Sequence, residues 1–77
     1  MRLKLTTHCQ IRIQERCIPI DHIKKAIAEP DKKEDAFEGL IKVSKKIEGR
    51  ILKVVYCKEG FKDKKDEYMV ITVYYPK

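Results

Sequence analysis

The spacing of apolar residues changes once along this chain, from the period of a helix to the period of a strand. Before residue 30, apolar side chains recur every three or four positions, as at Leu5, Cys9, Ile13 and Cys17. This spacing stacks them along one face of a helix. From residue 33 onward, apolar and polar residues alternate instead, which is the period of a half-buried strand. The order predicts helices first and a sheet after them.

Two helices are predicted, over residues 6–17 and 20–29. Thr6 or Thr7 can cap the first helix, because a side-chain oxygen at that position accepts a hydrogen bond from an otherwise unpaired backbone N–H. Pro19 suits the first turn of the second helix, where a missing N–H loses no helical hydrogen bond. The two helices are therefore expected to form a helical hairpin.

Strands are predicted at Leu40–Ile47, Arg50–Cys57 and Tyr68–Tyr75, with a further short one at Asp35–Glu38. The Glu48-Gly49 pair indicates a tight turn, since glycine readily adopts positive φ. Sequential strands with short connections favour an antiparallel sheet. The predicted fold class is α+β: an N-terminal helical hairpin packed on an antiparallel sheet of three or four strands. All 77 residues form one domain, because so short a chain has no room for a second core.

The alternation predicts one sheet face that packs on the helices and a second, more open face. Val55, Tyr68 and Val70 are expected on the open face and would leave it partly apolar. The polar residues expected there are Lys42, Ser44, Lys46, Lys53, Thr72 and Tyr74.

The net charge of +6 is concentrated in two parts of the chain. Residues 40–58 carry six lysines and arginines against Glu48, a net +5, and residues 1–19 carry four against Glu15, a net +3. Such an excess favours contact with a polyanion such as RNA or DNA. The alternative is a solvated surface that lysine keeps soluble.

Other site classes are disfavoured. The three cysteines are odd in number and lack Cys-x-x-Cys spacing, so neither a disulfide framework nor a zinc site is predicted. The chain has no Gly-rich phosphate loop and no plausible set of metal ligands, so no cofactor is expected. The chain also has no apolar run that could span a bilayer and no apolar signal region, which predicts a cytoplasmic protein.

His8, Arg12 and Arg16 lie four residues apart and align along one side of the first helix, beside its apolar face. Histidine is the side chain best suited to proton transfer near neutral pH. Two arginines beside it can hold a phosphate through paired hydrogen bonds and stabilise developing negative charge. The alternative is an ordinary polar helix flank, in which Glu15 pairs with a neighbouring arginine.

The open sheet face is the second candidate site. Lys42, Lys46 and Lys53 would attract phosphates, and Tyr74 could stack on a base or donate its hydroxyl. Thr72 is expected to point to the same face as Tyr74, because the two residues are two positions apart in one strand. The alternative is a solvated face with no ligand. The two candidate sites can meet only if the first helix lies at an edge or an end of the sheet.

The helices and the last strand contain three motifs: His8-x-x-x-Arg12-x-x-Glu15-Arg16-x-Ile18, then Ile23, Ile27 and Pro30, then Val70-Ile71-Thr72-Val73-Tyr74. Together they resemble, over nearly the whole chain, a small bacterial and archaeal family grouped with the RelE/ParE-like toxins. The resemblance implies a RelE-like fold, in which a helical hairpin packs on a small antiparallel sheet.

The resemblance also implies a function. RelE-like toxins are metal-independent endoribonucleases, and a toxin of this kind is paired with a small acidic antitoxin, whereas ParE-like members act on gyrase. The implied roles are His8 as general acid or base, Arg12 and Arg16 as phosphate clamps, and Tyr74 beside the scissile phosphate with Thr72 in support.

Three functional readings follow. The first is a RelE-like RNA-binding toxin, with or without endoribonuclease activity. The second is a non-catalytic module that binds an acidic partner or nucleic acid through its lysine face. The third is a homodimer that uses its exposed tyrosine and valine side chains as an interface.

Overall fold

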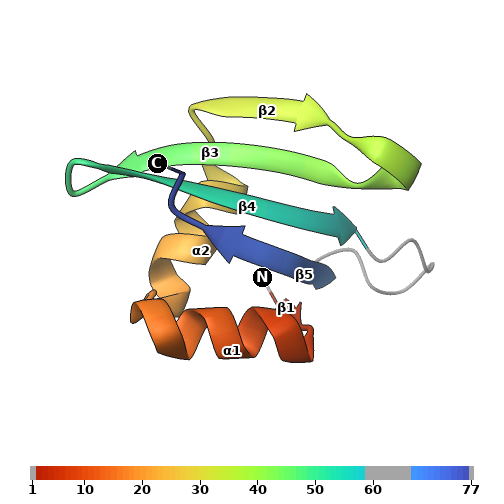
Figure 1. Cartoon of the computed structure of the whole chain (residues 1–77). Helices are drawn as coiled ribbons and strands as arrows, with labels where there is room; N and C mark the ends of the chain where they lie inside the picture. Colours follow the sequence, from red (N-terminus) through yellow and green to blue (C-terminus); the bar gives the residue numbers. More distant parts are fainter. Residues whose placement is uncertain (1, 59–66, 77) are drawn as a thin grey trace.

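The protein folds into one mixed sheet accompanied by two helices, seen in a computed structural model that describes residues 2–58 and 67–76 (Figure 1). A short 3-10 turn at Phe37–Gly39 separates two of the strands. In chain order the elements are β1 (Arg2–Leu5), α1 (Thr7–Arg16), α2 (Ile20–Ala28), β2 (Lys32–Asp35), β3 (Ile41–Ile47), β4 (Arg50–Lys58) and β5 (Glu67–Tyr74).

The sheet has five strands in the order β1-β5-β4-β3-β2. Strands β2 to β5 are antiparallel to their neighbours, whereas β1 pairs with β5 in parallel. The α+β class is confirmed, but the prediction of three or four strands, all antiparallel, is wrong. Strand β1 is four residues long, too short to show a period, and its partner lies more than sixty residues away in the chain. Glu67 of β5 supports this pairing through ion pairs with Arg2 (3.9 Å) and Lys4 (3.7 Å).

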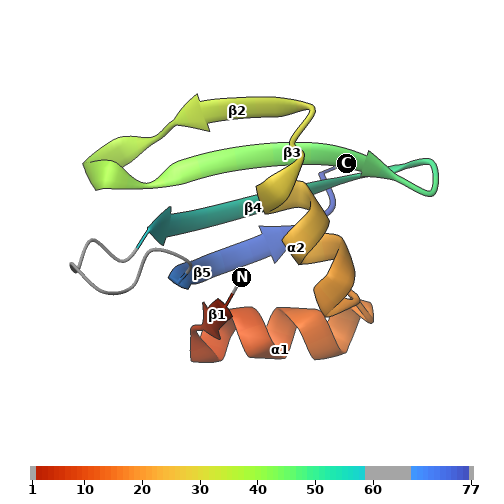
Figure 2. The same ribbon diagram turned by 180° about the vertical axis from the view of Figure 1, so that it is seen from behind.

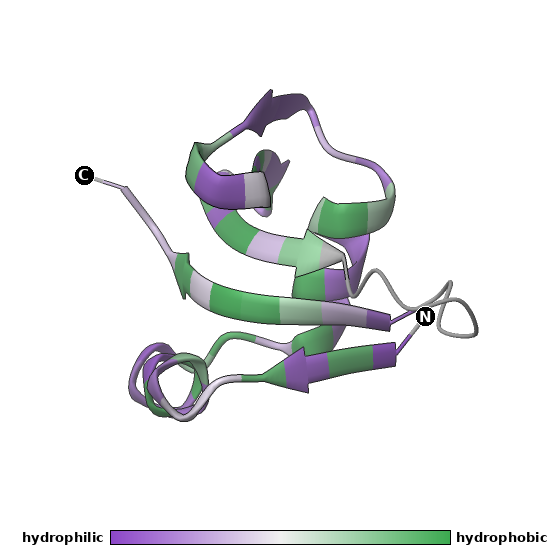
Figure 3. Ribbon diagram, turned by 90° about the vertical axis from the view of Figure 1, so that its right-hand side faces the viewer, coloured by the Kyte–Doolittle hydropathy of each residue, from purple (hydrophilic) through white to green (hydrophobic). Residues whose placement is uncertain are grey.

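The helices occupy different places around the sheet. Helix α2 covers one face and packs against β3 and β4, as the views from the front and from behind both show (Figures 1 and 2). Helix α1 lies at the edge formed by β5 and β1 and crosses these strands at a steep angle (Figures 1 and 3). The predicted N-terminal hairpin is therefore wrong in two respects: a strand precedes the helices, and their apolar faces are buried against different strands. Cys17, in the left-handed conformation (φ 52°), turns the chain between them.

Thr6 anchors the start of α1 to β5. Its hydroxyl accepts a hydrogen bond from the Cys9 N–H (3.1 Å), the N-cap that the sequence predicts. The same hydroxyl donates to the carbonyl of Ile71 (2.9 Å), and the Thr6 N–H donates to the carbonyl of Val70 (3.3 Å). Because these bonds join residues 65 and 64 positions apart, they determine where α1 begins relative to the sheet.

The core lies between the sheet and the helices, and its side chains come from α1, α2 and the three inner strands. Burial raises the pKa of the Tyr56 hydroxyl, and the neighbouring Tyr68 raises it further. Strand β2 is exposed along its whole length and is hydrophilic (Figure 3). The buried residues are Cys9, Ile18, Ile23, Ala26, Ile27, Val43, Leu52, Val54, Tyr56, Val70 and Val73.

The alternation between core-facing and open-facing side chains is interrupted once within β5. Val55 pairs with Thr72 but the next residue, Tyr56, pairs with Val70, so Ile71 is the extra residue of a β-bulge. An extra residue reverses which side chains face the core. Val70 is consequently fully buried and Tyr68 packs against the core, so the prediction that both lie on the open face is wrong.

The predicted turn at Glu48-Gly49 and the predicted short strand at Asp35–Glu38 differ in outcome. Glu48 and Gly49 both have positive φ (52° and 79°) and form the two-residue turn between β3 and β4, as predicted. The short strand predicted at Asp35–Glu38 instead occupies Lys32–Asp35. Positive φ at Glu38 ends extended structure there, and residues 37–39 form the 3-10 turn.

Candidate nucleic-acid interface

The pairing register aligns polar side chains in a row across the open face of the sheet. Lys32 pairs with Ser44, Ser44 with Lys53, and Lys53 with Tyr74. Directly paired residues point to the same side of a sheet. Four strands contribute one residue each, so this row, the lysine row, spans about 14 Å at the usual strand spacing.

Two further rows flank the lysine row on the same face. Lys46 pairs with Ile51 on one side, and on the other Lys42 pairs with Val55, which pairs with Thr72. Neighbouring rows are two residues apart along each strand, about 7 Å. The register thus places all six polar residues predicted for the open face on it: Lys42, Ser44, Lys46, Lys53, Thr72 and Tyr74.

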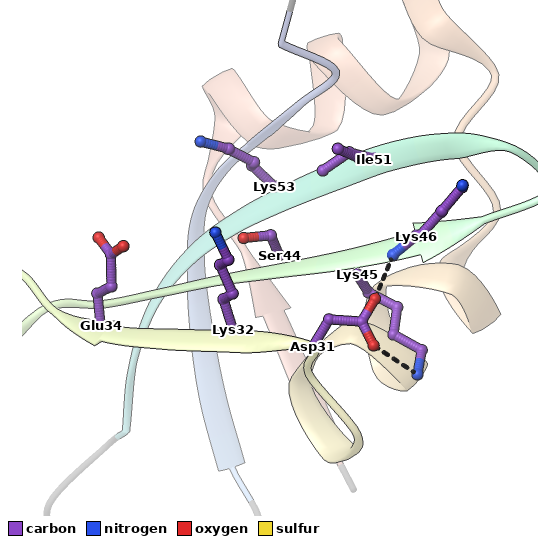
Figure 4. A pocket seen from close by; sticks show the side chains of 8 residues that line it. All are labelled: Asp31, Lys32, Glu34, Ser44, Lys45, Lys46, Ile51 and Lys53. Carbon is purple, nitrogen blue, oxygen red and sulfur yellow. Dashed lines mark hydrogen bonds and ion pairs between the residues drawn. The ribbon is translucent and has the colours of Figure 1, made fainter.

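One end of this face forms a hollow of about 270 Å³, the lysine hollow (Figure 4). The side chains of Lys32, Lys53 and Glu34 extend to the same side of the sheet there (Figure 4). The hollow is lined by Asp31, Lys32, Glu34, Ser44, Lys45, Lys46, Ile51 and Lys53.

Asp31 partly neutralises the lysine hollow. Its carboxylate accepts a hydrogen bond from the backbone N–H of Lys46 (2.8 Å) and pairs with the Lys45 ammonium at 3.5 Å. These contacts, the backbone hydrogen bond above all, lower the pKa of Asp31 below its ordinary value of 3.8. Asp31 therefore stays ionised at neutral pH and withdraws Lys45 from the positive charge available to a ligand.

The predicted stripe of His8, Arg12 and Arg16 lies on α1, at the edge of the sheet that β5 and β1 form. Helix α1 begins next to Ile71 and contacts β5, but it crosses this strand at a steep angle: it is seen nearly end-on in Figure 3, where β5 extends across the view. The bond between the Thr6 hydroxyl and the Ile71 carbonyl places the first turn of the helix, which includes His8, near the middle of β5. Thr72, the next residue of β5, has its side chain on the open face.

His8 and Arg16 are exposed and Arg12 is half-buried. Helix α1 lies at an edge of the sheet, the position that the two predicted sites need in order to meet. No side-chain hydrogen bond within residues 2–58 and 67–76 links the stripe to Tyr74, and none of the ion pairs found there joins Glu15 to an arginine.

The end of the sheet carries a second hollow, of about 540 Å³, which we call the arginine hollow. Arg16 comes from the end of α1 and Arg50 from the start of β4, and Tyr75 follows β5. The guanidinium carbon of Arg50 lies 3.7 Å from the centre of the Tyr75 ring, the geometry of a cation–π contact. Its lining is Arg16, Gly49, Arg50, Ile51, Tyr75 and Pro76.

Sequence reasoning missed Arg50 and Tyr75 as site residues. Arg50 counts only toward the positive charge of residues 40–58, and Tyr75 reads as the end of a strand. Arg50 has a local signal, because it directly follows the Glu48-Gly49 turn and must therefore lie at the end of the sheet. Tyr75 has no such signal. Their contact with each other depends on how β4 and β5 pair.

A family model described as a domain of unknown function, DUF4258, matches residues 5–75. The chain belongs to the DUF4258 family. The match includes both helices, strands β2 to β5 and both hollows apart from Pro76, so the candidate interface lies almost wholly within the DUF4258 domain. Neither the search of curated proteins nor the search of solved structures found a match.

Two general properties of this DUF4258 domain complete the description. No helix in the described ranges is long and apolar enough to cross a membrane. No group of three or more His, Cys, Asp or Glu residues within those ranges is arranged to hold a metal ion.

Proposed function

We propose that this protein is an RNA-binding protein of the RelE-like toxin type, and that it cleaves RNA where α1 meets β5. One observation carries the proposal. Helix α1 starts beside Ile71 and contacts β5, so the helix that carries His8, Arg12 and Arg16 borders the strand that carries Thr72 and Tyr74. An imidazole and a phenol can serve as general base and acid in metal-independent cleavage of a phosphodiester, and guanidinium groups can stabilise its developing charge.

The sheet face supplies RNA binding in this proposal. Lys53 lies directly beside Tyr74, and Lys42 and Lys46 lie on the adjoining rows. Each ammonium group can neutralise one phosphate and release its counterions. Tyr74, half-buried at the end of the lysine row, offers an aromatic face on which a base can stack. The RNA backbone would thus cross the sheet toward α1.

Cleavage would follow from attack by the ribose itself. His8 takes the proton from a 2′-hydroxyl, whose oxygen forms a bond to the adjacent phosphorus. The bond from phosphorus to the 5′-oxygen of the next nucleotide breaks, and Tyr74 donates a proton to that oxygen. Arg12 and Arg16 stabilise the additional negative charge on the phosphorane, and Thr72 supports Tyr74 by hydrogen bonding. The products are a 2′,3′-cyclic phosphate and a 5′-hydroxyl.

The test is a cleavage assay on single-stranded RNA with the wild-type protein and a His8→Ala/Arg12→Ala double variant. The double variant should be slower by a factor of about 10² to 10⁴, because general acid–base catalysis contributes that much. His22→Ala is the matched control, since it removes the other histidine of the chain from α2. Wild-type protein that cuts no faster than the double variant would reject catalysis.

A non-catalytic module for an acidic partner is the second candidate. The observation that favours it is that His8 is exposed and no side-chain hydrogen bond found among the described residues orients its ring. A salt titration separates the two ligand classes, because RNA affinity falls linearly in log salt with a slope of about −0.7 per phosphate. A small acidic antitoxin would instead saturate at one-to-one, and such a protein encoded beside this one would support the toxin proposal.

A further inference from the structure

The arginine hollow is chemically different from the sheet face that it adjoins. Its two charged side chains, Arg16 and Arg50, are both exposed, and none of its six lining residues is acidic. An arginine fork binds phosphate through two parallel hydrogen bonds, whereas a lysine acts only as a point charge. The hollow therefore combines unneutralised phosphate-binding groups with enough space for a small planar group.

The stacked pair of Arg50 and Tyr75 provides a platform for a base. The guanidinium carbon lies 3.7 Å from the ring centre, so the two groups are in contact before a ligand arrives. RNA-binding proteins stack unpaired bases on aromatic rings and on guanidinium planes in this way. Preorganisation lowers the entropy lost on binding. A base can stack on this pair whatever its identity.

Ile51 connects the two hollows. It lines both of them and is 48% exposed. It also lies two residues before Lys53 on the same face of β4, a separation of about 7 Å along the strand. That separation is comparable with the distance between successive phosphates in an extended single strand, so one polynucleotide can pass from the lysine row to the arginine hollow.

We infer that the arginine hollow is a nucleotide subsite for single-stranded RNA, in which Arg50 donates hydrogen bonds to a phosphate and its contact with Tyr75 supports a base. The inference rests on the proposed RNA binding and extends it beyond the open face. A strand bound there would turn around the end of the sheet after crossing the lysine row. Short RNA would then contact only the lysine row, and longer RNA would contact both.

The test compares a labelled trinucleotide with a labelled octanucleotide of single-stranded RNA by fluorescence anisotropy. Tyr75→Leu should weaken binding of the octanucleotide about tenfold, the usual worth of one base stack, and leave the trinucleotide unchanged. Tyr75→Phe retains the ring and should bind like the wild type. An octanucleotide with one abasic position within its subsite-contacting end should bind the wild type as weakly as the intact octanucleotide binds Tyr75→Leu.

The charge of the subsite is tested separately. Arg50→Gln should make the slope of log affinity against log salt shallower by about 0.7 for the octanucleotide only. Lys25→Gln is the matched control: it removes the same charge from an exposed position on α2, which covers the opposite face of the sheet.

The possible outcomes separate the inference from the proposed function. If Lys53→Gln weakens binding of both RNAs while Tyr75→Leu and Arg50→Gln bind the octanucleotide like the wild type, the subsite is rejected and RNA binding stands. If Tyr75→Leu weakens both lengths equally, or unfolds while the abasic octanucleotide binds normally, the ring has a structural role only. If the wild type binds neither RNA, both proposals fail.

Discussion

Both hollows are lined by Ile51, but they differ in whether a carboxylate neutralises their positive charge. In the lysine hollow, Asp31 holds Lys45 at 3.5 Å and accepts a hydrogen bond from the backbone of Lys46. In the arginine hollow, Arg50 stacks on Tyr75 and no carboxylate is among the lining residues. One hollow is partly neutralised from within, and the other presents its full charge to a ligand.

This difference teaches that a count of lysines and arginines is a poor guide to how much positive charge the folded surface leaves unpaired. Residues 40–58 carry most of the net charge of the chain, but part of that charge is already paired in the folded protein. A phosphate near an unpaired guanidinium gains a charge-assisted hydrogen bond without first displacing a carboxylate. The arginine hollow should therefore contribute more binding energy per residue than the lysine hollow.

The largest effect on RNA affinity is expected when the sign of one charge is reversed, and the two hollows should differ in its size. Arg50→Glu should weaken RNA binding about hundredfold, because it removes a charge-assisted hydrogen bond and the stacked guanidinium together. Lys46→Glu should weaken it about tenfold, since only an exposed point charge changes. Binding isotherms at one fixed salt concentration measure both. Equal losses would abolish the distinction between the hollows.

Removing the carboxylate that neutralises part of the lysine hollow should make the positive charge of the two hollows more alike. Asp31→Asn releases Lys45 and should strengthen RNA binding about threefold to tenfold, with a salt slope steeper by about 0.7. Glu34→Gln removes the other carboxylate that lines the lysine hollow, and no ion pair within the described residues involves Glu34. It should therefore give a smaller gain. An affinity that does not change in Asp31→Asn would mean that Lys45 never contacts the ligand.

Lowering the pH should remove the stability that Asp31 of the lysine hollow contributes to the folded chain. The pKa of Asp31 is lower in the folded chain than its ordinary value of 3.8, so the unfolded chain binds more protons in acid. The stability that Asp31 contributes is complete above that ordinary value and is lost as pH falls through the lower, folded pKa. Urea unfolding of wild type and Asp31→Asn should show a difference at neutral pH that disappears in strong acid. A difference that persists there would contradict this assignment.

The smallest effect is expected at the residue that the hollows share. Ile51→Ala should change the free energy of unfolding by less than about 1 kcal/mol, because its side chain is already half exposed. Ile23→Ala, fully buried under the sheet, should cost about 2–5 kcal/mol and serves as the comparison. RNA affinity should fall only about twofold in Ile51→Ala. A tenfold loss would show that Ile51 itself contacts a base.

Much of the fold could be predicted because its signals are local. The cap at Thr6, the end of α1 near Cys17 and the turn at Glu48-Gly49 all depend on residues within a few positions of one another. The open-face positions of Lys42, Lys46 and Lys53 followed from alternation within β3 and β4. The bulge at Ile71 could not be read in the same way, because most residues of β5 are apolar on both faces, which hides a break in the alternation.

The amino-acid sequence by itself determined the α+β class, the two helices, the β3–β4 hairpin and the placement of lysines on one face, because periodicity, caps and turns act between near neighbours. Only the tertiary structure decided that β1 completes the sheet, that α1 lies at its edge, and that Arg16, Arg50 and Tyr75 surround one hollow. These contacts join parts of the chain that are far apart in sequence. Their geometry depends on which strands pair and on how much apolar surface each arrangement buries, and a short sequence pattern predicts neither of these.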